Sequence, residues 1–330
     1  MGAWKDIFAM WVGVPVVLVG LSMGCGDSGG SSVPERPPGY NGATTQAVIS
    51  PSSAAAISKT LFVQTQSQQS LSSVEGLYLG QDQGLPPSAL PFLEQGISAT
   101  KGVAAPSLPL TKAPVTSSNT IDGACGGTLT LATTIDAAAG EYDIKVTYDA
   151  FCFEGITLNG LYTLSVNADG DGLFAGAIDV RYTRHVVTEP EGTQRYEGAL
   201  KVTWSGDHML QTWNYSVTNL TTGLGAQYAS FDIKTELTAT EVTWTQTGRF
   251  YHPVYGYVDV ATEVPFAADA SLELPHTGCL KMTGVAATGG PAFGWFEVSS
   301  EGFQVTVDAN GDGTVDGNSG VLTWNFLGLP

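Results

Sequence analysis

From Cys125 to the C-terminus, apolar and polar residues alternate with a period of two, and this alternation restricts the chain to β-structure. In one run, Tyr142, Ile144, Val146 and Tyr148 are separated by charged residues and threonine. Successive side chains of a strand point to opposite faces, so each such run predicts a strand with one buried face and one wet face. The same pattern recurs over residues 156–166, 178–186, 196–204, 213–217 and 242–250.

Short turns separate these runs, and closely spaced turns indicate an antiparallel meander. We therefore expect an all-β domain over residues 119–330, built as a single antiparallel meander of about 12–13 strands. One apolar face throughout implies one core. The sheet would enclose that core by closing as a barrel or by folding over as a sandwich.

The first hairpin of this domain brings two cysteines together. With residues 136–141 as its loop, the register places Cys125 opposite Cys152, and both lie on the apolar parity of their strands. Opposed residues of antiparallel strands have Cβ atoms about 4.5–5.5 Å apart, which a disulfide can bridge with modest adjustment. We predict a Cys125–Cys152 disulfide. Cys279 is left as a free thiol or as a partner in an intermolecular bond.

The charge balance excludes nucleic acid as a partner. The chain of 330 residues carries 31 Asp and Glu against 13 Lys and Arg, a net charge of -18 at pH 7. Binding to a phosphate backbone needs a basic patch, which so few cations can hardly form. With 13% charged residues and 41 glycines, the composition is also unlike that of a long helical bundle.

The first 24 residues have the layout of a secretory signal peptide. Lys5 gives a positive start, residues 7–21 form an apolar run, and the small residues Ser22 and Gly24 precede Cys25. The run is shorter than the roughly 20 residues that span a bilayer. We expect residues 1–24 to be removed on export, into a compartment where disulfides persist.

The placement of Gly24-Cys25 directly after the apolar run resembles the lipobox of bacterial lipoproteins. In that family the cysteine is diacylated and becomes the N-terminus, which implies a palmitate-type lipid on Cys25 and the membrane as a partner. The chain departs from the family at Ser22, where leucine is favoured, and an ordinary signal peptide with a chance cysteine is the alternative. Gly26, in place of aspartate, favours the outer membrane, with the protein facing the periplasm or the cell surface.

Residues 25–118 are expected to form a tether between the lipid and the β domain. Ten of the 17 prolines fall in this stretch, together with many Ser, Gly, Thr and Gln residues. Such a composition buries too little apolar surface to offset the conformational entropy of the chain. Most of the segment should therefore be loosely packed.

One part of this segment has the signals of a helix. Ser50 followed by proline is typical of a helix start, and an Ala-rich run predicts a helix over residues 51–66. A lone helix of this length is marginal in water. We expect Ile57, Leu61 and Phe62 to dock on the β domain; the alternative is a nascent helix in a disordered linker.

The most specific polar motif is an Asp-x-Asn-x-Asp-Gly run at residues 308–313. It resembles the first half of an EF-hand calcium loop, in which oxygen ligands alternate along the chain. The residues that this resemblance assigns to calcium are Asp308, Asn310, Asp312, Thr314 and Asp316. The glutamate expected at the twelfth position is Ser319, so an Asp- and Gly-rich hairpin turn is the alternative. Asn167–Gly172 has the same spacing with fewer ligands.

No catalytic pattern stands out elsewhere. The four histidines are scattered, with His185 on the polar parity of its strand, and no zinc spacing is present. A glycoside hydrolase needs two converging carboxylates. The strand carboxylates all fall on the water-facing parity: Asp143, Asp149, Asp179, Glu197, Asp232 and Glu241.

Residues 250–257 form an unusually aromatic cluster. Exposed rings of this kind stack on carbohydrates or anchor partners, and the alternative is packing within a strand crossover. The residues of this predicted binding patch are Phe250, Tyr251, Tyr255 and Tyr257.

Three functions follow from these observations. The first is a lipid-anchored envelope protein whose non-enzymatic β domain binds a protein, a glycan or another copy of itself, with no cofactor other than the calcium considered above. The second is an envelope glycan hydrolase that uses loop carboxylates, and the third is an outer-membrane β-barrel. The run from Cys125 through Cys152 is also similar to a pattern in uncharacterised exported bacterial β proteins, which implies the fold and the disulfide but no activity.

Overall fold

The computed structural model describes residues 40–72, 114–136, 141–153, 155–168, 176–190, 192–205, 207–238, 240–269 and 274–324, with the backbone alone for residues 63–72. Within these residues the strands form one antiparallel sheet, in which each strand pairs with its neighbours in sequence from β1 to β14. The elements are α2 (Pro51–Ser72), β1 (Val115–Asp122), β2 (Thr128–Asp136), β3 (Glu141–Phe153), β4 (Ile156–Ala168), β5 (Gly176–Glu189), β6 (Gly192–Ser205), β7 (His208–Asn219), β8 (Gly225–Leu237), β9 (Glu241–His252), β10 (Gly256–Asp269), β11 (Thr277–Val285), β12 (Pro291–Ser299), β13 (Gly302–Asp308) and β14 (Gly317–Asn318). No helix in the described part of the chain is long and apolar enough to cross a membrane.

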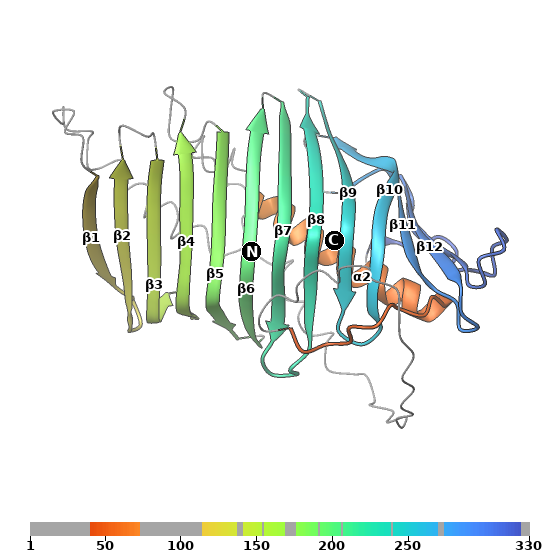
Figure 1. Ribbon diagram of the computed structural model, residues 1–330, viewed down its shortest axis with the longest axis horizontal. Helices are drawn as coiled ribbons and strands as arrows, with labels where there is room; N and C mark the ends of the chain where they lie inside the picture. Colours follow the sequence, from red (N-terminus) through yellow and green to blue (C-terminus); the bar gives the residue numbers. More distant parts are fainter. Residues whose placement is uncertain are drawn as a thin grey trace, which may run out of the picture.

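The all-β meander is confirmed, but its closure as a barrel, one of the two expected forms, is wrong. The sheet has 14 strands, slightly more than the 12–13 expected, and it is not closed into a barrel, because β1 and β14 lie at its two ends and do not pair with each other. Figure 1 shows β1 to β9 side by side as a broad sheet, while β10 to β12 turn back at the C-terminal end and α2 crosses behind the strands. The helix contacts β9, β12 and β13. Over this C-terminal part of the sheet, the helix supplies a second layer.

The predicted helix is present and docks as expected. Ser50 and Ser53 cap it reciprocally: the Ser53 N–H donates to Ser50 Oγ at 3.2 Å, and the Ser50 N–H donates to Ser53 Oγ at 2.9 Å. This arrangement satisfies backbone donors that a helix start leaves free. Ile57, Leu61 and Phe62 are buried in the core, with exposed fractions of 0%, 1% and 4%.

The segment before the helix is also built into the sheet. The Ala47 N–H donates to the Tyr257 carbonyl at 2.7 Å, and the Ala47 carbonyl accepts from the Val285 N–H at 2.9 Å. Thr45 and Ile49 extend the same contacts on either side. This stretch therefore joins the ends of β10 and β11. It belongs to the folded domain, although the composition of residues 25–118 predicts a loosely packed tether there.

Two clusters of buried side chains lie along one side of the sheet, which we call the helix face. The larger cluster joins α2 to β7–β13 and includes Trp213, Tyr228, Phe231, Phe250, Phe266 and Phe296. The smaller cluster lies on β2–β5 and includes Leu129, Leu131, Ile144, Val146, Tyr148, Phe151, Leu158 and Leu164. We call the opposite side of the sheet the polar face.

Irregularities interrupt the alternation in several strands: β10 shifts its register at residues 262–267, and three β-bulges in other strands lie at residues with positive φ. Ala150, Arg184 and Ser230 have φ of 48°, 47° and 46°, and each lies at a register shift, in β3, β5 and β8. A bulge adds one residue to a strand, so the parity that faces the core reverses after it. In β3, burial accordingly passes from Tyr148 to Phe151.

The predicted disulfide is present. β2 and β3 pair in the expected register up to the loop, and Cys125 is bonded to Cys152 with Cα atoms 5.0 Å apart. The expectation that both cysteines lie on the apolar parity is wrong, because Cys125 is exposed and Cys152 is only half-buried. The bulge at Ala150 directs Phe151 into the core and Cys152 away from it. The bond therefore lies at the surface of the sheet.

Candidate binding surface on the polar face of the sheet

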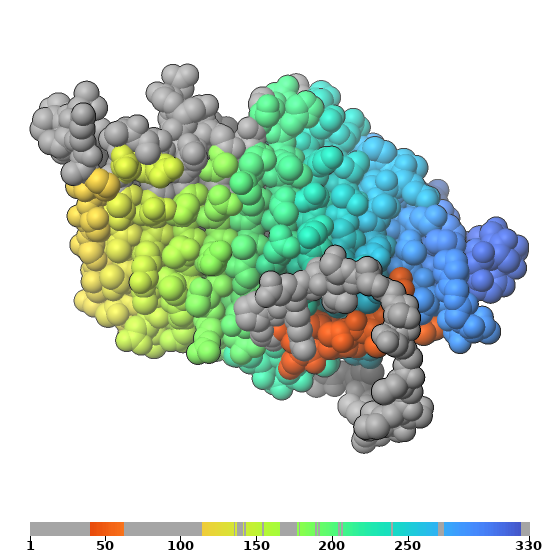
Figure 2. Space-filling model, in the orientation of Figure 1, coloured from red at the N-terminus to blue at the C-terminus, as the bar shows by residue number. Residues whose placement is uncertain are grey.

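The strand carboxylates lie where their parity places them. All six predicted carboxylates are exposed or half-buried. Two of them accept hydrogen bonds from hydroxyls on the neighbouring strand: Ser165 Oγ donates to Asp143 at 2.6 Å, and Thr212 Oγ1 donates to Asp232 at 2.7 Å. These contacts order polar side chains across the broad surface seen in Figure 2.

Polar side chains on this surface line up in two rows that cross the strands. The register of β3 to β8 places directly opposed residues beside one another on the same face. The first row is Asp143, Ser165, Asp179, Lys201, Thr212 and Asp232. The second row is Lys145, Thr163, Arg181, Ala199 and Asn214. Charged groups of both signs and neutral hydroxyls therefore alternate over a few strands.

The rows enclose a shallow hollow over β4–β7. Its volume is about 530 Å³, and its lining includes Asp179, Arg181, Lys201, Ala199 and Asn214. Ala199 is the small residue between Arg181 and Asn214 in the second row, which leaves room at that point. The hollow presents donors and acceptors together, as a polyhydroxylated ligand would require.

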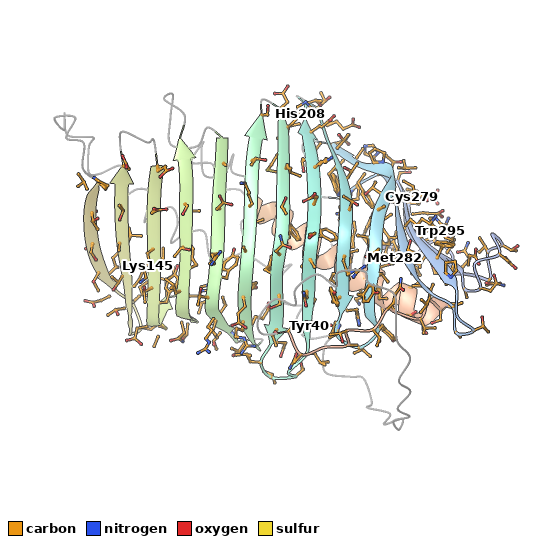
Figure 3. All side chains as sticks on the ribbon, viewed as in Figure 1. Tyr40, Lys145, His208, Cys279, Met282 and Trp295 are labelled. Carbon is orange, nitrogen blue, oxygen red and sulfur yellow. A yellow bond between two sulfur atoms is a disulfide. The ribbon has the colours of Figure 1, made fainter. Side chains whose placement is uncertain are left out.

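An aromatic platform lies on the same face near the C-terminal end, made of Lys281, Phe293, Trp295 and Glu263. The rings of Phe293 and Trp295 are 6.0 Å apart, and Lys281 Nζ lies 4.4 Å from the Phe293 centroid and 5.6 Å from that of Trp295. Glu263 accepts a hydrogen bond from Trp295 Nε1 at 3.1 Å and pairs with Lys281 at 3.5 Å. Both rings are half-exposed, and Figure 3 shows Trp295 on the curled end of the sheet. The polar contacts hold the two rings in a fixed orientation.

Arg249 extends the charged surface on β9 and β10. Its Nε and Nη2 donate to the two carboxylate oxygens of Asp259, at 2.7 and 3.1 Å. The guanidinium carbon also lies 4.1 Å from the centroid of Tyr257. The hydrogen bonds to Asp259 raise the pKa of Arg249, so this cation is permanent. Pairing with Asp259 and stacking on Tyr257 hold the guanidinium in one orientation.

Cys279 lies on this face as its parity predicts, half-buried and without a disulfide. Burial, with Glu297 and Glu263 nearby, raises the pKa of its thiol to about 11. Because the thiolate is the reactive form, Cys279 is a poor nucleophile at neutral pH. Gln304 donates a short hydrogen bond to Glu297 beside it.

The predicted aromatic patch is divided among different environments. Phe250 is fully buried in the larger core cluster, and Tyr251 is 5% exposed and packs on Tyr40. Tyr255 is exposed at the β9–β10 turn, and Tyr257 is half-buried beneath Arg249. Burial therefore removes Phe250 and Tyr251 from any surface patch, and of this set Tyr257 adjoins the polar surface described above.

The Asp-rich loop uses its own side chains to close the turn. Asp308, 1% exposed, accepts from the Gly311 N–H at 2.7 Å and from the Gly313 N–H at 2.8 Å. Asp316 accepts from the Ala309 N–H at 2.8 Å, and Asp312 accepts from the Thr314 N–H at 2.8 Å, which lowers the pKa of Asp312. Asn310 likewise accepts from the N–H of Asp312 at 2.9 Å. These are turn-forming contacts.

No group of three or more His, Cys, Asp or Glu side chains in the described ranges is placed to hold a metal ion. Calcium binding at the loop stays a prediction, since its ligands would include the Thr314 carbonyl and the Asn310 amide. The second predicted loop, Asn167–Gly172, lies largely outside the described residues.

The position of His185 differs from the sequence expectation. The bulge at Arg184 turns His185 onto the helix face, where it is 3% exposed. The rings of Tyr148, Tyr182, Tyr162 and Tyr196 surround it at centroid distances of 5.5, 5.9, 6.1 and 6.1 Å. Burial lowers the pKa of His185 to about 4, so the imidazole is neutral at physiological pH. The reversal is caused by the bulge, which the parity of the sequence alone does not show.

The lipidation residue Cys25 and the tether residues before 40 lie outside the described part of the chain. Comparisons with protein-family models, curated proteins and solved structures found no match.

Proposed function

We propose that this chain is a non-enzymatic protein of the bacterial cell envelope, held to a membrane by a lipid on Cys25, and that its β domain binds glycan through the polar face. The observation that carries the proposal is the aromatic platform of Phe293 and Trp295, held by Lys281 and Glu263 on an open sheet. Flat aromatic rings offer apolar contact to the C–H faces of sugars, and fixed polar groups beside them bond the hydroxyls.

The hollow over β4–β7 supports the same proposal. The hollow lies on the same side of the sheet as the platform. Neighbouring strands are spaced about 4.8 Å apart, so the path from β7 to β12, measured along the sheet, is roughly 24 Å. An extended polymer could contact both places at once, whereas a small metabolite could not. When one polymer contacts both places, the second contact forms at a high effective concentration, so the overall affinity exceeds that of either weak contact alone.

Binding is tested by sedimenting the full chain with purified peptidoglycan sacculi, and then on an array of bacterial surface polysaccharides. Trp295→Ala should lower the affinity at least tenfold, about 1.4 kcal/mol, because it removes the larger stacking ring. Tyr255→Ala is the matched control, since Tyr255 is an exposed aromatic residue at a hairpin turn outside the platform. Equal loss in both variants, or no binding by the wild type to any glycan, would overturn the proposal.

The same samples distinguish binding from hydrolysis. Release of soluble sugars by the wild type, abolished by Asp312→Asn, would replace the binding function with that of a glycan hydrolase. Asp312 suits this test because its side chain is exposed, whereas the buried Asp308 holds the loop together.

The anchor is tested separately. Cys25→Ser should move the protein from the membrane fraction to the soluble fraction and remove the mass of the lipid from the mature chain. Cys279→Ser, which changes a thiol of the folded domain, should leave the fractionation unchanged. Retention of the Cys25→Ser protein in the membrane would refute lipid anchoring at this residue.

A further inference from the structure

The two edges of the sheet differ in how they are protected. At the C-terminal edge, β14 pairs with β13, Phe303 and Leu322 exchange hydrogen bonds of 3.0 and 2.7 Å, and the Val305 N–H donates to Ser319 Oγ at 2.9 Å. At the other edge, β1 pairs with β2, and no other strand among the described residues pairs with it. Figure 1 shows β1 as the outermost strand.

Within its eight residues, β1 carries none of the sequence features that usually prevent an edge strand from pairing. Its register with β2 runs without a shift from Val115 to Asp122, so the strand has no bulge. It contains no Lys, Arg or Pro, and its single charge is the terminal Asp122. Seven of its eight residues are exposed, among them the apolar Val115, whose exposed fraction is 45%. Edge strands normally carry charges, prolines or bulges to avoid association, so an open, regular edge is a template for another strand.

The free backbone groups of β1 can be identified from the end of its ladder. The Gly123 N–H donates to the Gly127 carbonyl at 2.9 Å, so Gly123 points toward β2. The N–H and C=O of successive residues in a strand point to opposite sides. The odd-numbered residues of β1 therefore face β2, and Thr116, Ser118 and Thr120 direct their N–H and C=O groups outward.

We infer that β1 pairs antiparallel with β1 of a second copy of this chain, across a two-fold axis that is perpendicular to the sheet and passes midway between the Ser118 residues of the two copies. In this register Ser118 faces Ser118 of the second copy, Thr116 faces Thr120, and Val115 faces Ile121. The opposed residues have the same parity, so the helix faces of both copies lie on the same side. Each pair of outward-pointing residues exchanges two hydrogen bonds, as in any antiparallel ladder.

The side chains fit this register. Thr116 and Thr120 already lie 3.3 and 3.4 Å from threonine hydroxyls on β2, and the new Thr116–Thr120 pairs continue that ladder. On the other face, Val115 and Ile121 form apolar pairs that extend the smaller core cluster, against which Ile121 packs. Asp122 would face Pro114, so no like charges are opposed. A strand that complements itself in this way favours a second copy over an unrelated chain.

Net charge determines how strongly two copies associate. Each chain carries -18 at pH 7, so copies repel one another over a distance that salt reduces. An edge-to-edge contact also buries little surface. The dimer should therefore be weak in dilute, low-salt solution and stronger at high protein concentration and high salt. A lipid anchor, which rests on the proposed function, would raise the local concentration further.

Sedimentation velocity of the full chain tests the inference, at rising protein concentration in low and high salt. The wild type should form a dimer, and no larger species, in a fraction that increases with concentration and salt. Ser118→Pro should be monomeric with little change in its unfolding midpoint, because the N–H that proline removes points outward. Ser117→Pro is the matched control: it removes an N–H that faces β2, so it should destabilise the fold.

A cross-link tests the register. In a Cys279→Ser background, Ser118→Cys should be joined to a second copy by a short thiol-specific cross-linker. Thr147→Cys, on the polar face of β3, should not. A wild type that is monomeric at every concentration and salt, a dimer that persists in Ser118→Pro, or equal cross-linking at positions 118 and 147 would each overturn the inference.

Discussion

Lowering the pH should weaken the fold through His252, which closes the β9–β10 hairpin as a neutral acceptor. Its Nδ1 accepts hydrogen bonds from the backbone N–H groups of Val254 and Tyr255, at 3.2 and 3.3 Å. The side chain is buried, with 6% exposed, and its ring lies 4.9 Å from that of Tyr255. Burial lowers its pKa from 6.5 to about 4. A proton on Nδ1 would remove the acceptor and leave a charge in the interior.

The pKa difference gives the magnitude and the sign. Because the folded-state pKa of His252 lies below the unfolded value, the unfolded chain takes up the proton first as the pH falls. The contribution to stability is therefore present above about pH 6.5 and is lost as the pH falls toward 4. One pKa unit corresponds to about 1.4 kcal/mol, so the loss is roughly 2 kcal/mol at pH 5 and levels off near 3 kcal/mol below pH 4.

Urea unfolding at pH 8 and pH 5 measures this loss. Both pH values lie above the isoelectric point of about 4.3. His252→Asn is the informative variant, because an asparagine oxygen can accept from the same N–H groups and does not titrate. The stability of the wild type relative to this variant should fall by about 2 kcal/mol between the two pH values. His208→Asn, at an exposed site, should track the wild type. A wild-type-to-His252→Asn difference that is the same at both pH values would refute the reasoning.

Three further changes probe the fold. Phe62→Ala should lower the free energy of unfolding by about 3–5 kcal/mol in urea, because it empties the contact between helix and sheet; an unchanged midpoint would mean that the helix does not hold the core. Reducing the Cys125–Cys152 bond should cost roughly 3–4 kcal/mol by chain entropy, measured as the difference between oxidised and reduced protein, and a difference below 1 kcal/mol would contradict this. Gly160→Ala should destabilise by at least about 2 kcal/mol in thermal unfolding, since φ is +98° and the new Cβ would lie 2.1 Å from the Arg184 carbonyl oxygen; a neutral effect would show that the bulge relaxes.

The strands, their order and the first hairpin could be predicted because each depends on residues close in sequence. Alternation reports which face of a strand is buried, and a loop of known length sets the register of the two strands that it joins. That is why the bond between Cys125 and Cys152 was predictable. The helix start at Ser50 was predictable for the same reason, since a cap acts on the next three residues.

The bulges were not predictable from parity. Ala150 and Arg184 are not residue types that favour positive φ, so nothing at those positions marks the extra residue. The signal lies on the neighbouring strand, where Asn159 accepts from the Ala150 N–H at 2.8 Å and Gly160 allows the close approach of Arg184. A glycine in the middle of a strand pattern is a known sign of a bulge. Reading it would have placed His185 in the core.

The aromatic platform shows the same limit. Phe293 and Trp295 are two residues apart, so they share a face in any strand without a bulge between them. Lys281 and Glu263 come to them from two other strands, and their meeting depends on the registers of β10, β11 and β12 together. The aromatic run at residues 250–257 looks more prominent in the sequence, yet part of it is buried in the core.

By itself, the sequence determined that the chain after residue 125 forms antiparallel strands with one apolar side. The reason is that the alternation of apolar and polar residue types already indicates which side chains of a strand are buried. Only the tertiary structure decided how that apolar side is covered and which edge is left open. A barrel, a sandwich and an open sheet under a helix all bury the same alternate residues. The choice among them is made by contacts between residues far apart in the chain, such as Phe62 of the helix against Phe296 of β12, with ring centroids 5.0 Å apart.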